Sequence, residues 1–407
     1  MFKRFWSYRF LLSFLHAFFL VFLTLWSLSL PFTFGDEATL IQYSATVKRK
    51  ILPELDKPDR NRFMFVGVTW EKQLIEKVDE KTGLPIGYDV ITNRESLGKF
   101  LQMLNQNPNN HKFLLIDIFF QNKSPNDSLL AAELKRVKNC VVSYHKDEKG
   151  APMYPIFEAP LGLSDMQTDS WTDMVLKYHL IQGDSLKTTP LVMYEKIYNQ
   201  QIEHGLFFDK LNGKTIFNSF IIDYRLRNYD LFDADEEKRY PFFYIKDLIE
   251  LPLEVFAEFT KDKIIIVGDF QGSDTHPTIE GDMAGPLILL NAFLDLEAGD
   301  NVLSPFFLVL LFVFYFVISL KIFTPNDVVT QYVESKVKNK LQKGIIHALL
   351  DVSVYVFYMG ILSIMSYFLF GIHLTILTLS VYMEFLEKFV NWLHEKLLKK
   401  NDEMAVG

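Results

Sequence analysis

Residues 263–269, KIIIVGD, are a run of four β-branched apolar residues closed by Gly268 and Asp269. A short apolar run that ends in a turn residue is typical of a strand buried on both faces. Four further segments share this pattern, at residues 63–68, 112–120, 140–144 and 215–222. The sequence therefore predicts a sheet whose strands are covered on both sides.

Helical patterns separate these predicted strands. Apolar residues recur at spacings of three and four in residues 96–105, 127–137, 188–200 and 286–298. We place Ser96 and Asp127 as N-caps, and Gly299 at the end of the last helix. Alternating strands and helices favour an α/β domain with a mostly parallel sheet and helices on both faces. We expect residues 146–187 and 223–250 to be insertions at the sheet edge.

An uncharged, largely apolar stretch at residues 10–34 precedes this domain. It is long enough to cross a bilayer as a helix. Lys3, Arg4 and Arg9 lie before it, which predicts that residues 1–9 stay in the cytoplasm. A cleaved signal peptide is the alternative, but the stretch is long for one and no small-x-small cleavage site precedes Asp36. The sequence favours an uncleaved membrane anchor.

Three more apolar blocks, residues 303–323, 345–370 and 374–393, follow the polar residues 36–301. Lysines are concentrated in residues 324–344 and in the tail, residues 394–407, whereas residues 371–373 hold none. By the positive-inside rule, the loop and both termini are cytoplasmic, and residues 36–301 form an exported domain. We expect four transmembrane α-helices.

Composition excludes several classes of protein. The net charge of −8 argues against a nucleic-acid binder, which needs a basic surface. A single cysteine, Cys140, rules out an internal disulfide and any multi-cysteine metal site. Because Cys140 begins a predicted strand, we interpret it as a small core residue rather than a reactive thiol.

The order of these elements resembles the second type of CHASE domain, a bacterial family of sensory extracellular domains associated with cyclases and histidine kinases. The resemblance rests on six segments: RFMFVGVT (62–69), FLLIDIFF (113–120), NDSLLA (126–131), KIIIVGD (263–269) and the two loop pieces DTHPT (274–278) and MAGP (283–286). It implies one transmembrane helix before the domain and three after it. It also implies a bacterial inner-membrane location with the domain in the periplasm.

Two departures from the family pattern bear on function. Asn291-Ala292 stands where the family usually has a His-Ala pair. Family members normally continue into a cyclase, kinase or phosphatase domain, whereas this chain ends about 15 residues after the fourth predicted crossing. We therefore expect any output to pass through another subunit.

Polar residues follow the predicted strands at one edge of the sheet. Asp117 lies within one strand, and Asp269, Asp274 and His276 follow the last. The carboxyl ends of parallel strands open into the crevice where ligands bind, so these four residues are the predicted ligand site. Carboxylates there could also hold a divalent cation, and acidic loop residues often only cap turns. No G-x-S-x-G, H-E-x-x-H or P-loop motif occurs, so we predict neither catalytic residues nor a cofactor or metal.

The membrane segments carry acidic residues of their own. Glu384 lies ten residues beyond the 371–373 turn, roughly 15 Å deep, and Glu387 follows one turn later. An intramembrane carboxyl group predicts a function or a partner. The alternatives are a proton relay and pairing with Lys388. Asp351 lies near the cytoplasmic end of its helix, level with His394 and Lys396, where we expect it to pair.

These features predict a non-catalytic accessory or scaffold subunit of a larger envelope complex, with a periplasmic sensory or docking domain. The alternative is a sensor subunit that relays a periplasmic signal to a separate kinase or cyclase. Both hypotheses imply the lipid bilayer and other membrane subunits, or further copies of this chain, as partners. Neither implies nucleic acid.

Overall fold

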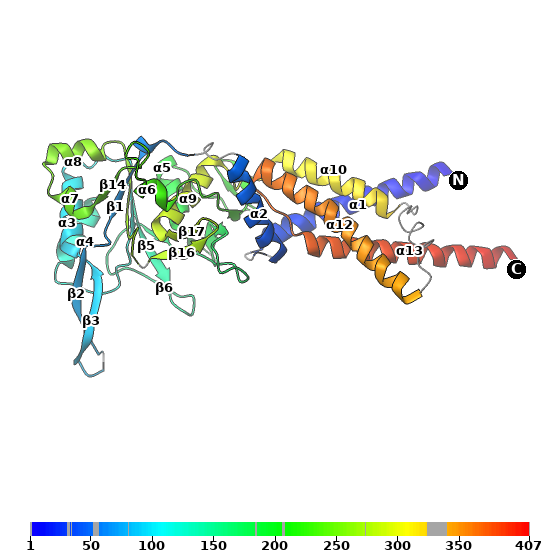
Figure 1. Ribbon diagram of the computed structural model, residues 1–407, viewed down its shortest axis with the longest axis horizontal. Coiled ribbons are helices and arrows are strands. Elements are labelled where there is room, and N and C mark those ends of the chain that lie inside the picture. The colour runs from blue at the N-terminus through cyan, green and yellow to red at the C-terminus, as the bar shows by residue number, and fades with distance from the viewer. Residues whose placement is uncertain are drawn as a thin grey trace. The chain divides into compact units, whose positions relative to one another are not determined.

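A parallel sheet organises the residues that the exported domain was predicted to contain (Figure 1). The structure is a computed structural model that describes residues 2–30, 33, 35–51, 57–79, 81–183, 185–205, 208–272, 274–323 and 340–406. The chain divides into two units, residues 49–301 and a helical unit of residues 1–48 and 302–407.

The main sheet has seven strands in the described part of the chain. Its order is β14 (Phe242–Tyr244), β1 (Phe63–Gly67), β15 (Ile264–Gly268), β4 (Phe113–Asp117), β5 (Cys140–Lys146) and β6 (Pro152–Met153), with β7 (Leu161–Leu163) also paired to β5. All pairs are parallel except β5 with β6. The predicted mixed α/β domain with a parallel sheet is therefore confirmed.

Helices cover both faces of this sheet, which explains its unbroken apolar strands. Every residue of β1 and β15 is buried. One face packs on α3 (Arg94–Gln106), α4 (Asp127–Arg136), α7 (Ile245–Ile249) and α8 (Leu253–Thr260). The other packs on α5 (Thr189–Tyr198) and α9 (Gly285–Ala298). Each fully buried large apolar side chain contributes about 1.5–3 kcal/mol, so this core is the main source of stability.

The prediction of a single strand at residues 215–222 is wrong. Residues 215–222 form two short strands, β12 (Lys214–Ile216) and β13 (Ser219–Ile221), and neither joins the main sheet. The break has a local cause, because the Phe217 N–H donates to the Asn301 carbonyl (2.8 Å) and the Asn218 side chain bonds both backbone groups of Ile181. β12 pairs with β11 (Asp209–Leu211), and β13 pairs with β8 (Lys177–His179).

Both predicted N-caps also shift. Asn93, not Ser96, caps α3, because its side chain accepts from the N–H groups of Glu95 and Ser96. Asp127 is the first residue inside α4 rather than its cap, and its carboxylate accepts from the Ser124 N–H at 2.6 Å. The end of α9 is as predicted, since Gly299 adopts the left-handed conformation (φ 80°).

The sequence did not indicate several smaller elements. A long hairpin of β2 (Lys72–Val78) and β3 (Pro85–Thr92) projects from the α/β domain (Figure 1). The predicted insertions contain the short elements α6 (Asn228–Phe232), β9 (Ile181–Gln182) and β10 (Leu186–Lys187). Elsewhere in the unit lie η1 (Arg60–Arg62), β16 (Thr275–Thr278) and β17 (Gly281–Ala284).

The helical unit contains three helices that are long and apolar enough to cross a membrane, among the residues described. They are Tyr8–Leu28 in α1 (Phe2–Leu28), Pro305–Ile322, which is α10, and Ser353–Phe370 in α12 (Lys340–Phe370). The fourth predicted block is helical, as α13 (Ile376–Val406), but it is not among these three. Residues 324–339 of the predicted cytoplasmic loop lie outside the described residues.

Residues 36–48 form most of α2 (Gly35–Ile51) and belong to the helical unit. We had placed them at the start of the exported domain. Asp36, at the start of α2, accepts hydrogen bonds from the first two N–H groups of α13, those of Ile376 and Leu377, at 2.8 Å each. A carboxylate at this position is favourable because the N-terminus of a helix presents unpaired donors and a partial positive charge.

Candidate functional site

Strand register brings the predicted site residues to one edge of the sheet. β15 and β4 pair in parallel, with Gly268 opposite Asp117. Asp269 therefore leaves the sheet beside Asp117. Asp274 and His276 arrive through the following loop and β16, where His276 Nε2 lies 3.3 Å from Asp274 Oδ1.

A cleft of about 330 Å³ lies at this edge. Asp117, Asp269 and Asp274 line it, whereas His276 stands behind Asp274 and is not part of the lining. The remaining wall is contributed by the hairpin, by the segments after β1 and β4, and by one histidine; these residues are Val68, Lys72, Val90, Ile91, Thr92, Ile118, Phe119, Gln121, Asn122 and His145. The cleft thus combines charged groups with an apolar wall.

Asp117 is the carboxyl group of the cleft whose pKa is raised. Burial and the nearby negative charge of Asp274 raise the pKa of its carboxyl to about 6. Hydrogen bonds from Ser143 and Ser164, and the charge of His145, oppose this shift without cancelling it. Two carboxyl groups that share a partly buried site hold a proton more tightly than one alone.

His145 was missed by the sequence reasoning and belongs to the same cluster. Its Nδ1 lies 2.8 Å from Asp165 Oδ1, and Asp165 also accepts from the Lys146 N–H. Burial alone would lower the pKa of His145, but the hydrogen bond to Asp165 and the charges of Asp117 and Asp274 raise it. The sequence contained a signal for His145, because this residue directly follows the strand predicted at residues 140–144 and so lies at the same carboxyl edge of the sheet.

Asp269 is held in a different way from Asp117. Thr69 Oγ1 donates to it at 2.6 Å, the Gly272 N–H at 2.8 Å, and Lys72 Nζ forms an ion pair with it at 3.2 Å. Burial pushes the pKa of Asp269 upward, but these contacts outweigh it, so the pKa is lowered. Asp269 is therefore a fixed negative charge, anchored to the hairpin through Lys72.

The same arrangement bears on the cation hypothesis. Among the described residues, no group of three or more His, Cys, Asp or Glu side chains is arranged to hold a metal ion. The carboxylates of the cleft instead face a lysine, a histidine and apolar side chains. This chemistry suits an organic ligand better than a bare ion.

A family model for the CHASE2 domain matches residues 72–320, which include the hairpin, all but Val68 of the cleft lining, and most of α10. The chain belongs to the CHASE2 family. CHASE2 domains are extracellular-type sensory domains, and this membership together with the three apolar helices fits a membrane sensor. Comparisons with curated proteins and with solved structures give no match.

The predicted intramembrane residues lie outside the CHASE2 match. Glu384 is buried within the helical unit and pairs with Lys388, one turn later, at 2.5 Å. Glu387 accepts a hydrogen bond from the Tyr355 hydroxyl at 2.7 Å. The side chain of Asp351 lies outside the described residues. A contact between Glu384 and a partner stays a prediction.

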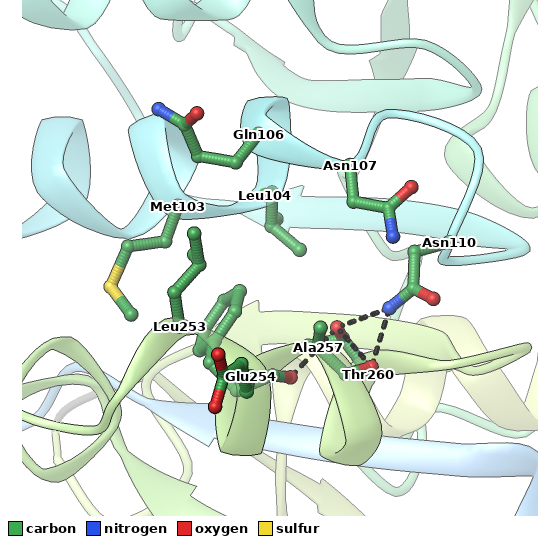
Figure 2. A pocket seen from close by; sticks show the side chains of 10 residues that line it. Met103, Leu104, Gln106, Asn107, Asn110, Leu253, Glu254, Ala257 and Thr260 are labelled. Atoms are coloured by element: carbon green, nitrogen blue, oxygen red, sulfur yellow. Dashed lines mark hydrogen bonds between the residues drawn. The ribbon is translucent and has the colours of Figure 1, made fainter.

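A second cavity, of about 250 Å³, lies between α3 and α8 on the helical face of the CHASE2 domain (Figure 2). Met103, Leu104 and Leu253 gather at one end, and Asn107 and Asn110 lie at the other. The Asn110 amide donates to the Ala257 carbonyl (2.6 Å) and to Thr260 Oγ1 (2.9 Å). Glu254 is its only ionisable lining residue, so this cavity offers far less chemistry than the cleft.

The raised pKa of Asp117 predicts a pH-dependent effect of its removal. The folded-state value, about 6, lies above the roughly 3.9 of an unfolded aspartate. The stability that Asp117 contributes is therefore complete below about pH 4 and is lost as the pH rises through 6. Asp117→Asn should raise the melting temperature of the purified protein at pH 7.5, by roughly 2 °C or more, and change it little at pH 4.

Asp269→Asn is the matched control, because the pKa of Asp269 is lowered. Its stabilising effect is present at pH 7.5 and is lost as the pH falls, so this variant should melt at a lower temperature at pH 7.5. A lower melting temperature for Asp117→Asn at pH 7.5 would contradict the description of this group.

Proposed function

We propose that the protein is a membrane-anchored receptor whose CHASE2 domain binds a small organic cation in the cleft at the carboxyl edge of the sheet. The observation that carries this proposal is the pair of neighbouring carboxyl groups, Asp117 and Asp274, inside a cleft with an apolar wall, where histidines are their only nearby cationic groups among the residues described. The family membership supports a sensory role.

The ligand class follows from the charges of the cleft. Asp269 already has Lys72 as its partner, and His145 already has Asp165. A positively charged group between Asp117 and Asp274 would lower the energy of both carboxylates and displace the proton that Asp117 retains. Val68, Val90 and Ile118 can contact the hydrocarbon part of the same molecule. A small amine with a short apolar body meets these requirements.

Thermal denaturation of the full chain in lipid nanodiscs tests this proposal. A panel of small primary amines, with the matching alcohols as controls, should contain compounds that raise the melting temperature in a saturable manner. Asp274→Asn should weaken that binding several-fold, because the side chain of Asp274 is 40% exposed and a solvent-screened charge contact is worth up to about 1 kcal/mol.

Asp282→Asn serves as the control, since Asp282 lies exposed in the same β16–β17 hairpin and does not line the cleft. Equal binding by the Asp274→Asn and Asp282→Asn variants would contradict the assignment of the cleft. The same conclusion would follow if no amine in the panel stabilised the wild-type protein.

We also propose that α13 crosses the membrane as a fourth helix, in a bacterial inner membrane with the CHASE2 domain in the periplasm. Contacts within the helical unit support the crossing. His16 Nε2 of α1 lies 3.2 Å from the Tyr382 hydroxyl of α13, and Ser27 lies 3.3 Å from Thr375. Asp36 caps the same helix. Side-chain hydrogen bonds of this kind help helices associate in lipid.

Reporter fusions test the proposed topology. A fusion at Gly150 should behave as exported, and fusions at Lys338 and Gly407 as cytoplasmic, because lysines dominate the segments around the last two sites. A cytoplasmic reporter at Lys338 with an exported one at Gly407 would show that α13 does not cross. An exported reporter at Lys338 would overturn the whole arrangement.

We further propose that the protein is a non-catalytic accessory or scaffold subunit of a larger envelope complex, which hands on the ligand state of the CHASE2 domain. The sequence supports this because it carries none of the catalytic motifs named above. The alternative, a sensor subunit that relays to a separate kinase or cyclase, is favoured by the family membership.

Purification in a mild detergent, followed by mass spectrometry of the co-purifying proteins, separates these two roles. The accessory role predicts stoichiometric recovery of other envelope proteins, and the relay role predicts recovery of a kinase or cyclase. Recovery of the chain without any stoichiometric partner would contradict both.

A further inference from the structure

One face of the β2–β3 hairpin, here called the free face, carries exposed apolar side chains beyond its base, where Lys72, Val90 and Thr92 line the cleft. In its register Leu74 pairs with Val90, and Glu76 pairs with Tyr88. Because side chains alternate along a strand, one face of the ribbon carries large apolar side chains that are 45–69% exposed; they are Leu74, Val78, Tyr88 and Val90. Figure 1 shows the hairpin standing out from the rest of the α/β domain.

The opposite face of the ribbon is anchored at its base. Gln73 donates to Ser124 at 2.6 Å, and Asn122 donates to Asp89 at 3.3 Å. The free face is covered at its base, where Lys72 contacts Asp269, whereas Leu74, Val78 and Tyr88 farther out are exposed. A two-stranded ribbon is at best marginally stable in water, and contiguous exposed apolar side chains usually mark an interaction surface. The hairpin therefore presents a face that requires an occupant.

We propose that the occupant is the same face of a second copy of this chain, bound about a two-fold axis that passes at the level of Leu74. The formal charges on this face are Lys72 and Glu76, two residues before and two residues after Leu74. When two such ribbons pack antiparallel, each Lys72 meets the partner's Glu76. The charge pattern is complementary to itself, as an isologous contact requires.

The same charges set the orientation of the two copies. A parallel arrangement would place Glu76 against the partner's Glu76 and Lys72 against the partner's Lys72, which costs energy. The antiparallel arrangement avoids both clashes and leaves the apolar side chains in the centre. Tyr88 is the aromatic anchor that such interfaces commonly use. The proposed contact shares Lys72 and Val90 with the cleft, where Lys72 pairs with Asp269 and Val90 lines the wall.

Cross-linking of the full chain in native membranes tests the contact directly. Cys140 is the only cysteine and is buried, so Cys140→Ser provides a cysteine-free background. Facing sheets lie about 10 Å apart, so a bis-maleimide of that reach suits a residue on the axis. Leu74→Cys should give a covalent homodimer, whereas Lys77→Cys, on the anchored face of the same ribbon, should give much less.

Substitutions test the energetics by the dimer dissociation constant of the full chain in detergent. Tyr88→Ala should raise this constant about tenfold or more. Glu76→Lys should also weaken the dimer, and so should Lys72→Glu, which in addition removes the contact with Asp269. The double exchange should restore the dimer, because it rebuilds both ion pairs between the copies. The rescue distinguishes a self-contact from general damage to the hairpin.

The proposal is overturned by any of three results. These are a wild-type chain that stays monomeric, equal cross-linking at positions 74 and 77, and a dissociation constant unchanged by Tyr88→Ala. Cross-linking of Leu74→Cys to a different protein would assign the face to that protein instead.

Discussion

The in-register parallel pairing of β15 between β1 and β4 is the constraint on which the rest of the CHASE2 domain depends. It aligns Gly67, Gly268 and Asp117 in one row, so the strands end together and their following residues emerge at one edge. Gly268 has a further role in this row. A Cβ there would lie 2.4 Å from the Pro286 side chain, so only glycine lets α9 start against the end of the strand.

This edge concentrates negative charge that the fold compensates only in part. Asp269 accepts hydrogen bonds from Thr69 and Gly272 and pairs with Lys72. Asp117 has serine hydroxyl groups and the charge of His145 in its favour, but the neighbouring carboxyl group of Asp274 and burial outweigh them. A partly buried carboxylate without a cationic partner is costly, and natural proteins keep such groups mainly at functional sites. The cost at Asp117 and the presence of a cleft at the same place are thus two aspects of one arrangement. A positively charged ligand would bind favourably for two reasons, because it would pair with Asp117 and would occupy the cleft.

The sequence predicted those parts of the fold that depend on local pattern. Runs such as IIIV (264–267) are buried on both faces, and only a covered parallel sheet satisfies them. The hairpin was missed because KQLIEKV (72–78) mixes charges with apolar residues that remain exposed, so it lacks a buried side. The single strand predicted at residues 215–222 is wrong for another reason. The side chain of Asn218 and the carbonyl of Asn301 take over backbone hydrogen bonds that a longer strand would need.

The candidate site was predictable in position but not in detail. Asp117, Asp269, Asp274 and His276 follow from the rule that parallel strands end at one edge, and His145 follows from it equally. Lys72 and Asp165 come from segments whose approach to that edge is a tertiary property. In the helical unit, α13 forms as expected, but residues 376–393 include Glu384, Glu387 and Lys388, and these charges make its apolar character weaker than that of the other three helices.

The central claim is that Asp117 is a carboxyl group which the fold leaves short of positive charge. Its titration can be followed by carbon-13 NMR of aspartate carboxyl groups in the domain of residues 49–301, with Asp117→Asn to assign the signal. The account predicts a midpoint near pH 6, well above that of the other aspartates. A midpoint below about 4, the ordinary range of an exposed aspartate, would contradict it.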